Sequence, residues 1–455
     1  MNDLNEPQTG IKKYFVIASL LFGLFFGAGN LIFPIHLGQM AGSHWLVATL
    51  GFLTASVLMP LLAILVISKS NASGIRDLGN PAGTKFALLF MILVQVTIGP
   101  LYATPRVATV SFAVGIKPLL GGQHSQLALL IYSALFFAVA FYFANRESTI
   151  IDTVGKIMNP LFLILLATLF VLAMLNPMGN PNLEAGQANF GNGTYFKGFL
   201  EGYNTLDMLA GLVFGGAVVN SVREMGYRKK RDVERITSLS GILTFLLTGL
   251  IYVGLILLGA MSLGKEQIAA EGGTTLVQIV RHLMGEPGQL FLAALIILAC
   301  LTTAIGLLTS FAEDFHRSFS KLSYRAWLTI STVASFGVAN IGLEKLIRWS
   351  VPILMFLYPI VIVLVLLGLT VYDAPAAKQL YRGTLLLTIV PALLDFVVKL
   401  PKQISGSAFG QAIANIQSHL PFYDIGLTWI IPSIIGFLIS WIYYMLRYRK
   451  IGLTK

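Results

Sequence analysis

A run of 55 residues near the start of the chain, from Tyr14 to Ser68, contains no Asp, Glu, Lys or Arg. As one helix this run would be roughly 80 Å long at ~1.5 Å per residue, whereas the hydrocarbon layer of a membrane is ~30 Å thick. The run therefore crosses a membrane twice, and Gly27-Ala28-Gly29-Asn30 lies near the middle of the first crossing. Irregular backbone survives at that depth only where protein buries it or where it lines a cavity. The sequence thus predicts a discontinuous helix, broken at these four residues.

The composition extends this interpretation to the whole chain. Of 455 residues, 56% are hydrophobic and 11% are charged, a balance too apolar for a soluble protein of this length. The net charge of +11 could suggest nucleic-acid binding, but the cations lie in short loops between apolar tracts, where the positive-inside rule places them. We therefore expect an integral membrane protein whose surroundings are a lipid bilayer, with no nucleic-acid partner. Cys300, the single cysteine, allows no disulfide within the chain.

Apolar tracts predict about twelve transmembrane helices in a single membrane domain that covers residues 1–455. With a cytoplasmic N-terminus, 22 of the 31 Lys and Arg residues fall in inner segments, so both termini are expected to be cytoplasmic. The expected spans are 14–38, 44–68, 86–115, 126–145, 157–175, 198–222, 236–262, 287–312, 326–343, 349–372, 383–400 and 425–446.

The sixth span is the second interrupted one. Its uncharged part, 208–222, is shorter than the ~20 residues that a crossing needs, so the span also takes in Glu201 and Asp207. Interrupted helices five spans apart, at the first and sixth positions, are typical of a transporter made of two inverted repeats, with its binding site at the two breaks. The first repeat is expected at 14–175 (helices 1–5), the second at 198–372 (helices 6–10), and two peripheral helices at 383–446.

A helix broken at mid-membrane leaves amides at the start of its second half and carbonyls at the end of its first half without helical partners. At the first break, a substrate carboxylate would bind the amides near Ala28, Gly29 and Asn30. Carbonyls from Gly23 to Gly27 would face a cation. The alternative is a small-residue face for helix packing, but the second interrupted span favours a binding site.

Two carboxylates of the sixth span are candidates for function. Asp207 lies far enough into the span to be expected in a cavity or paired with a cation, backbone donors or a proton. Its alternative role is to cap the helix at the break. Glu201 lies nearer the outer surface, where it is either a gate residue or a solvated residue at the rim.

The third span carries Tyr102 and Arg106 beside the prolines Pro100 and Pro105. The prolines predict a kinked helix with freed carbonyls. Tyr102 either donates a hydrogen bond to a carboxylate or packs as an ordinary aromatic residue. Arg106 is expected to form an ion pair at an outer gate, with Glu201 as one partner, or to contact the substrate carboxylate.

Span eight contains Thr302 and Thr303, adjacent hydroxyls that could complete an oxygen cage for Na⁺, although threonines in apolar helices usually bond their own backbone. Elsewhere, the six histidines show no metal-ligand spacing, and no P-loop or nucleophile motif is present. We therefore expect neither a cofactor nor an ATP-driven pump.

Three motifs together resemble the bacterial branched-chain amino acid carriers, the system II or leucine/isoleucine/valine:cation symporter family. They are Phe26–Pro34 (FGAGNLIFP), Gly99–Phe112 (GPLYATPRVATVSF) and Glu201–Ala210 (EGYNTLDMLA). The resemblance runs through all twelve spans. It implies an all-α protein of the LeuT-type fold, within the amino acid/polyamine/cation superfamily, that takes up leucine, isoleucine and valine with Na⁺ or H⁺ across the bacterial cytoplasmic membrane.

The resemblance also implies roles for individual residues. Gly27 to Asn30 resemble the substrate-facing break of the first helix, and Tyr102 lies in the helix that supplies a substrate-facing tyrosine in some relatives. The break of the sixth helix is expected between Asp207 and Gly215, with Ala210 and Gly211 as further substrate-binding positions. The implied sodium site consists of the carbonyls of Gly23 and Phe26 together with Ala299, Thr302 and Thr303.

The function expected from these observations is secondary symport of branched-chain amino acids by alternating access, without an obligate protein partner. One alternative is a permease for another neutral amino acid. A channel is disfavoured because no filter sequence or ring of charge is present. A membrane-embedded enzyme is disfavoured because no cluster of His and Asp lies on one membrane face. The sequence leaves the choice between Na⁺ and H⁺ open.

Overall fold

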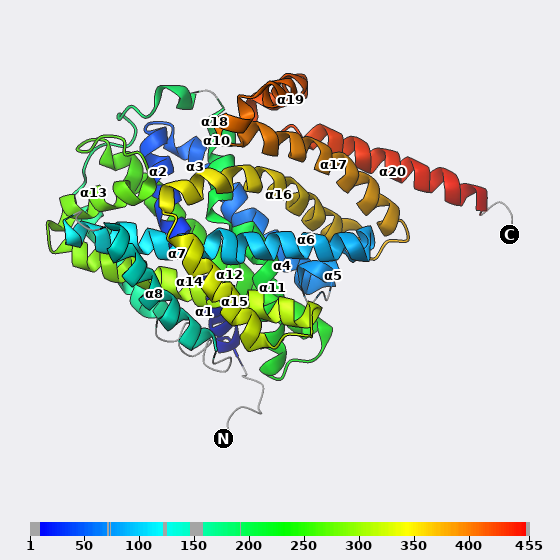
Figure 1. The fold of residues 1–455 in the computed structure, drawn as a ribbon, viewed down its shortest axis with the longest axis horizontal. Coiled ribbons are helices and arrows are strands. Elements are labelled where there is room, and N and C mark those ends of the chain that lie inside the picture. The colour runs from blue at the N-terminus through cyan, green and yellow to red at the C-terminus, as the bar shows by residue number, and fades with distance from the viewer. Residues whose placement is uncertain are drawn as a thin grey trace.

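A computed structural model of the chain describes residues 10–70, 72, 74–121, 125–145, 158–191 and 193–451. Most of these residues are helical (Figure 1), and none of them lies in a β-strand. The α-helices are α1 (Lys12–Phe25), α2 (Ala28–Ala41), α3 (Trp45–Leu53), α4 (Met59–Ser70), α5 (Ile75–Gly79), α6 (Thr84–Val96), α7 (Ala103–Ser111), α8 (Ser125–Ala144), α9 (Asn159–Leu175), α10 (Thr194–Gly202), α11 (Asp207–Glu224), α12 (Lys230–Ser262), α13 (Gly272–Met284), α14 (Gly288–Ser318), α15 (Tyr324–Ala339), α16 (Leu343–Val371), α17 (Ala377–Lys399), α18 (Lys402–Ser405), α19 (Ala408–Ser418) and α20 (Ile430–Ile451).

Within the described residues, eight helical stretches are long and apolar enough to cross a membrane, and two bent pairs bring the number to ten. The remaining expected spans, 157–175 and 326–343, correspond to α9 and α15, which are shorter at 17 and 16 residues. Residues 1–9 and 452–455, on which the placement of the termini depends, lie outside the described residues.

The first span is broken as the sequence predicts. α1 and α2 meet at a 72° bend. α1 ends at Phe25, and Gly27, with φ −118° and ψ −164°, is the extended residue that precedes α2. The break therefore falls at Phe26 and Gly27, and Asn30 already lies in the first turn of α2.

The sixth span is also broken, but earlier than expected. It bends by 43° between the 3₁₀ turn η9 (Tyr203–Thr205) and α11. Leu206, between them, has a left-handed φ of 69°, a conformation that costs a residue with a side chain roughly 1–2 kcal/mol. The expected interval from Asp207 to Gly215 is wrong, because that segment is continuous helix in α11.

The third span is kinked at its prolines, as the sequence predicts. A π-type turn, η3 (Thr97–Leu101), separates α6 from α7, and Gly99 within it has the non-helical angles φ −80° and ψ −116°. Tyr102 then precedes α7 with φ −139°. The kink turns α7 so that Tyr102 and Arg106 are buried.

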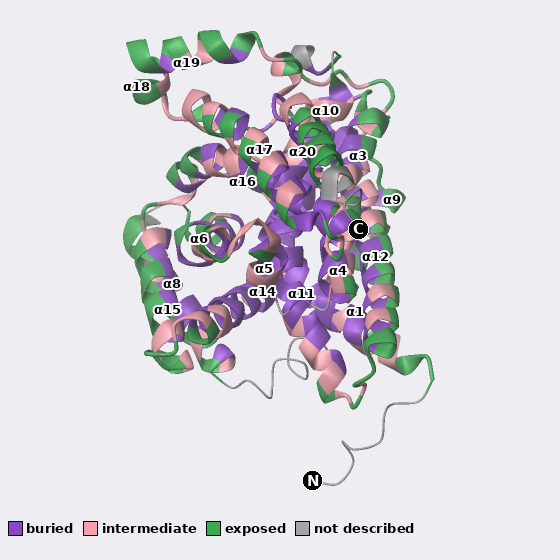
Figure 2. Ribbon diagram, turned by 90° about the vertical axis from the view of Figure 1, so that its right-hand side faces the viewer, coloured by how far each residue is buried: buried purple, intermediate pink, exposed green. Residues whose placement is uncertain are grey.

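Buried residues concentrate on α1, α4, α11 and α14 in the middle of the molecule (Figure 2). The second half of the first span, α2, packs on α12 through glycines. A Cβ atom on Gly38 would overlap the carbonyl of Ile256, and one on Gly259 would overlap the carbonyl of Ile35. Small residues let two helix backbones approach this closely. The contact therefore holds α2, the helix that follows the first break, against α12.

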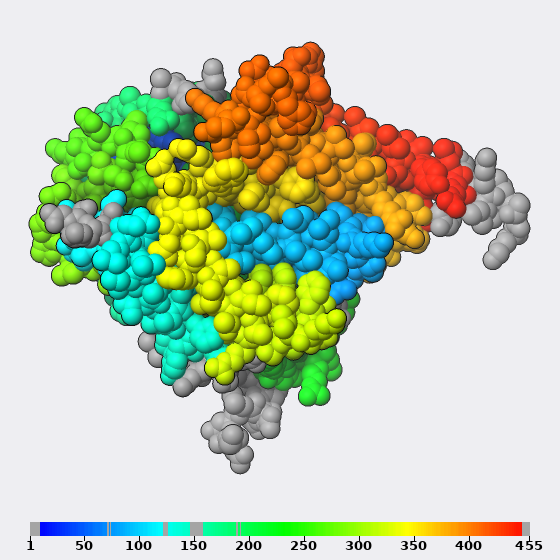
Figure 3. Space-filling view, viewed as in Figure 1, coloured from blue at the N-terminus to red at the C-terminus, as the bar shows by residue number. Residues whose placement is uncertain are grey.

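The last helices lie at the edge of the molecule. α20 packs on α17 and extends away from the body, whereas α19 stands out at the top (Figures 1 and 3). Along α20, the apolar side chains of Ile434, Leu438 and Ile442 are exposed, as expected for a helix that faces lipid.

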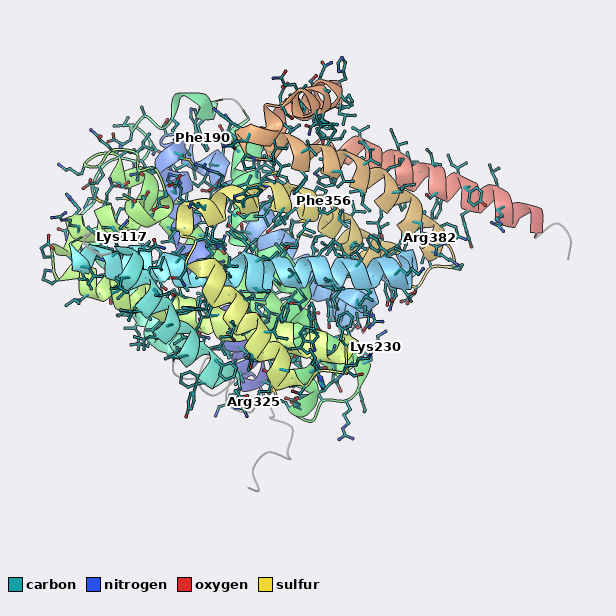
Figure 4. All side chains as sticks on the ribbon, viewed as in Figure 1. Lys117, Phe190, Lys230, Arg325, Phe356 and Arg382 are labelled. Carbon is teal, nitrogen blue, oxygen red and sulfur yellow. The ribbon has the colours of Figure 1, made fainter. Side chains whose placement is uncertain are left out.

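The labelled residues distinguish two opposite sides of the molecule. Lys230, Arg325 and Arg382 lie along its lower and right-hand edges, whereas Lys117 and Phe190 lie toward the upper left (Figure 4). We refer to the side that holds the start of α1 and the ends of α11 and α14 as the N-terminal side. The opposite side, which holds the start of α10 and α19, is called the α19 side.

Candidate functional site

The two broken spans are joined by a buried ring of hydrogen bonds. The side-chain amide of Asn30 donates to Asp207 Oδ1 at 2.7 Å and also to the Tyr252 hydroxyl. That hydroxyl donates to Asp207 Oδ2 at 2.6 Å. The three residues come from α2, α11 and α12, and each is at most 2% exposed. The ring therefore fixes the start of α2, the start of α11 and the middle of α12 to one another.

Asp207 is the first residue of α11, and the ring engages both of its carboxylate oxygens. It thus joins helices at the break rather than projecting its carboxylate into open space. Tyr252 is the partner that the sequence did not reveal. A single tyrosine in an apolar span usually signals packing, and no motif distinguishes this one.

The ring also changes the backbone at the first break. Asn30 Oδ1 accepts a hydrogen bond from the Gly27 amide at 3.0 Å. In a continuous helix that amide would donate to the carbonyl of Gly23, four residues earlier. The Gly23 carbonyl, one of the predicted cation ligands, therefore loses its helical donor.

Arg106 lies against the first break and is 3% exposed. Its Nη1 donates to the Tyr102 hydroxyl at 2.8 Å and to the Asn204 carbonyl at 2.7 Å. A Cβ atom on Gly29 would lie only 2.7 Å from its Nη2, and its Nε has no partner among the described residues. The guanidinium thus adjoins the N-terminus of α2, where amides and the helix dipole also favour an anion.

The direct ion pair expected between Arg106 and Glu201 is absent from the described residues, so that prediction is wrong. Glu201 Oε2 instead accepts a hydrogen bond from the side-chain amide of Asn204 at 3.1 Å. Since Arg106 binds the carbonyl of the same Asn204, this residue stands between the two charges. No sequence motif distinguishes Asn204, because asparagine is common in loops and turns.

The two threonines of α14 lie in different environments. Thr302 Oγ1 donates to the carbonyl of Ala299 at 3.0 Å, the backbone bond typical of helical threonine. Thr303 Oγ1 is buried without a partner in the described part of the chain. A Cβ atom on Gly27 would lie 2.6 Å from this oxygen, so the hydroxyl points at the first break. An unpaired buried hydroxyl costs ~1–3 kcal/mol, which a cation would offset.

These oxygens match the chemistry of a monovalent hard cation better than that of a transition metal. Carbonyl and hydroxyl oxygens are ligands that hard cations prefer. In the described part of the chain, no group of three His, Cys, Asp or Glu side chains could hold a metal ion.

A cavity of about 600 Å³ leads toward the first break from the N-terminal side. Its walls come from α1, α11, α14 and Tyr324. It extends from Glu224 and Arg317 at the ends of their helices to Leu24 and Gly306, and Gly306 is three residues, or one turn, beyond Thr303.

The two predicted substrate-binding positions within α11 beyond Asp207 are Gly211 and Ala210. Gly211 faces α4, where a Cβ atom would lie 3.0 Å from Ala63 Cβ and 3.1 Å from the carbonyl of Pro60. Ala210 is in the first turn of α11, its amide bonded to the Leu206 carbonyl at 2.9 Å. The structure therefore gathers the first break, Tyr102, Arg106, Asp207 and Thr303 into one region, whereas Gly211 serves helix packing.

Comparison with protein families matches residues 11–447 to the family described as "Branched-chain amino acid transport protein". The chain is 40% identical over 426 residues to the branched-chain amino acid permease BrnQ of Lactobacillus delbrueckii subsp. lactis, covering 93% of this chain and 95% of that protein. It is 36% identical over 434 residues to the branched-chain amino acid permease BraB of Bacillus subtilis (strain 168), covering 95% of both.

Among solved structures, the nucleobase-cation-symport-1 family transporter Mhp1, in a closed conformation with bromovinylhydantoin bound, superposes with a TM-score of 0.59. The match covers 94% of this chain and 91% of Mhp1 at 12% identity, so it concerns the fold alone. The all-helical architecture with broken first and sixth spans is accordingly a LeuT-type fold.

Proposed function

Because this chain belongs to the family of branched-chain amino acid transport proteins, we propose that it is a secondary symporter that takes up leucine, isoleucine and valine together with Na⁺. It is a membrane transporter rather than an enzyme. The observation that carries the proposed mechanism is the ring of Asn30, Asp207 and Tyr252. This ring holds the two helix breaks together, and a substrate and an ion would bind the bare backbone groups beside it.

The substrate carboxylate would bind the start of α2. The amides of Ala28 and Gly29 lie at the start of the helix, where no helical carbonyl is available to accept their hydrogen bonds. The Arg106 guanidinium adjoins Gly29. Carbonyl groups at the end of α1 suit the substrate ammonium group. Because each methylene in an apolar pocket changes affinity by only ~1–3 kcal/mol, one pocket would accept leucine, isoleucine and valine.

The cation would bind between α1 and α14. The Thr303 hydroxyl lacks a partner in the described residues, and the Gly23 carbonyl has lost its helical donor to Asn30. Phe26, Ala299 and Thr302 would complete the oxygen ligands. A bound Na⁺ would therefore hold α1 against α14 beside the substrate.

Alternating access would use the cavity on the N-terminal side. Residues between it and the break, including Leu24 and Gly306, are in close contact, since a Cβ atom on Gly306 would lie 2.6 Å from Leu24 Cδ2. Movement of α1 away from α14 would open this contact and release both solutes. We place this side in the cytoplasm of a bacterial cell, with both termini there, and assign the inverted repeats to 14–175 and 198–372.

Competition for uptake tests the proposed substrate class. Proteoliposomes that contain the protein should take up radiolabelled leucine, and excess isoleucine or valine should reduce the uptake at least tenfold. Alanine, serine and phenylalanine at the same concentration should leave it within twofold. Stronger competition by one of these three would reassign the protein to another neutral amino acid.

A further inference from the structure

A separate cavity of about 360 Å³ lies on the α19 side, away from the broken ends of the first span. It is enclosed by α10, α16, α17 and the segment that includes α19 and η10 (Tyr423–Ile425). Figures 1 and 2 both show α10, α17 and α19 near one another at the top of the molecule. None of the residues proposed for transport lines this cavity.

The cavity carries charges of both signs. Lys197, Asp395, Lys399 and Asp424 line it, from α10, α17 and η10. A solute with a single charge would match only half of this lining, whereas a zwitterion would match both signs. A neutral α-amino acid places its ammonium and carboxylate groups on one carbon atom, which suits a small mixed-charge site.

One buried side-chain oxygen at this site, Gln417 Oε1, lacks a hydrogen-bond donor among the described residues. Asp395, 5% exposed, accepts hydrogen bonds from the Thr428 hydroxyl at 2.8 Å and from the side-chain amide of Gln417. Gln417 is 2% exposed, and its Oε1 has no partner in the described part of the chain. An ammonium group would supply the missing donor, with Asp424 as a nearby counter-charge.

Most of the remaining lining is apolar. Leu200, Met355 and Val398 contribute aliphatic walls from α10, α16 and α17. They would receive the side chain of an aliphatic amino acid, while Lys399 at the exposed edge would attract the carboxylate. We propose that this cavity is a second binding site, for a neutral aliphatic amino acid, separate from the transport site.

The position of the cavity connects it to the second break. α10 leads directly into η9, which begins at Tyr203. The Tyr203 ring stacks on Tyr358 at 3.9 Å between centroids, and the Tyr358 hydroxyl donates to the Tyr203 carbonyl at 2.8 Å. An amino acid in the cavity would tie α10 to α17 and restrain the outer half of the broken sixth span.

Equilibrium binding of tritiated leucine to the full chain in lipid nanodiscs tests this site. Val398→Trp fills the cavity, and Val398→Ala is the matched control that leaves it open. Relative to the unsubstituted protein, Val398→Trp should bind one leucine fewer per chain, and Val398→Ala should bind the same number. Equal stoichiometry for Val398→Trp and the unsubstituted protein would overturn the proposal.

A milder substitution covers the case in which Val398→Trp fails to fold. Lys399→Met should weaken the second leucine-binding event about tenfold and leave the other unchanged, whereas unaltered affinity at both would contradict the assignment. Gly29→Val, which crowds the proposed transport site against Arg106, should retain the leucine bound in the cavity. If only the proposed transport site fails, one leucine per chain should still bind. Val398→Trp should then abolish this remaining binding.

Discussion

Asp207 is a carboxylate in the middle of an apolar helix bundle, and its stability there depends on the hydroxyl and amide that it binds. Both of its oxygens accept hydrogen bonds, from Asn30 and Tyr252. A buried charge without such partners would be expensive in lipid surroundings. The ring therefore makes it possible to keep an acidic group at the point where α11 begins.

Tyr252→Phe should destabilise the protein by ~1–3 kcal/mol, because it leaves one buried carboxylate oxygen without a donor. Thermal unfolding in detergent should show a lower melting temperature, and leucine uptake should fall. Tyr381→Phe is the control, since Tyr381 is also fully buried but its hydroxyl has no partner in the described residues. An equal loss of stability in both variants would count against the ring.

Thr303→Ala should raise the Na⁺ concentration needed for half-maximal leucine uptake about tenfold, equivalent to ~1.4 kcal/mol. The reason is the loss of a hydroxyl that points at the first break without a protein partner. Thr303→Ser keeps the hydroxyl and should retain the native Na⁺ dependence. If Thr303→Ala responds to Na⁺ as the native protein does, the proposed cation site is incorrect.

The two helix breaks differ in how well the sequence predicts them. Gly27 to Asn30 mark the first break because small residues at mid-membrane depth are a local signal. The second break depends on Leu206, whose left-handed φ of 69° is unusual for a leucine. Gly211 and Gly215 led to a predicted break beyond Leu206. In the structure, both glycines instead allow close contact with α4.

Helix contacts mediated by glycine should be the least tolerant of added volume. Gly259→Ala would push a methyl group into the Ile35 carbonyl, and neither backbone can move without separating α2 from α12. We expect a large loss of folded protein, measured by size-exclusion chromatography and thermal unfolding. Gly337→Ala in α15 is the control, because nothing lies within 4 Å of its added Cβ. It should be neutral or stabilise the helix by up to ~1 kcal/mol; similar damage from both would contradict this explanation.

For the molecule as a whole, the apolar tracts predicted the helices, and the three motifs predicted the family. Long uncharged runs identify helices because a membrane admits few other structures. The contacts between distant helices were harder to predict from the sequence. Tyr252 reaching Asp207, and Asn204 standing between Arg106 and Glu201, depend on side chains that meet only after folding. The cavity beside Asp395 likewise requires α10, α16 and α17 to be in place.

Leucine uptake into proteoliposomes, with Na⁺ and proton gradients imposed in separate experiments, tests the proposed mechanism most directly. An inward Na⁺ gradient alone should concentrate leucine inside above its external level, and an ionophore that dissipates this gradient should abolish the accumulation. A proton gradient without Na⁺ should give no accumulation. Concentrative uptake driven by protons in the complete absence of Na⁺ would show that the ion held between α1 and α14 is not the coupling ion.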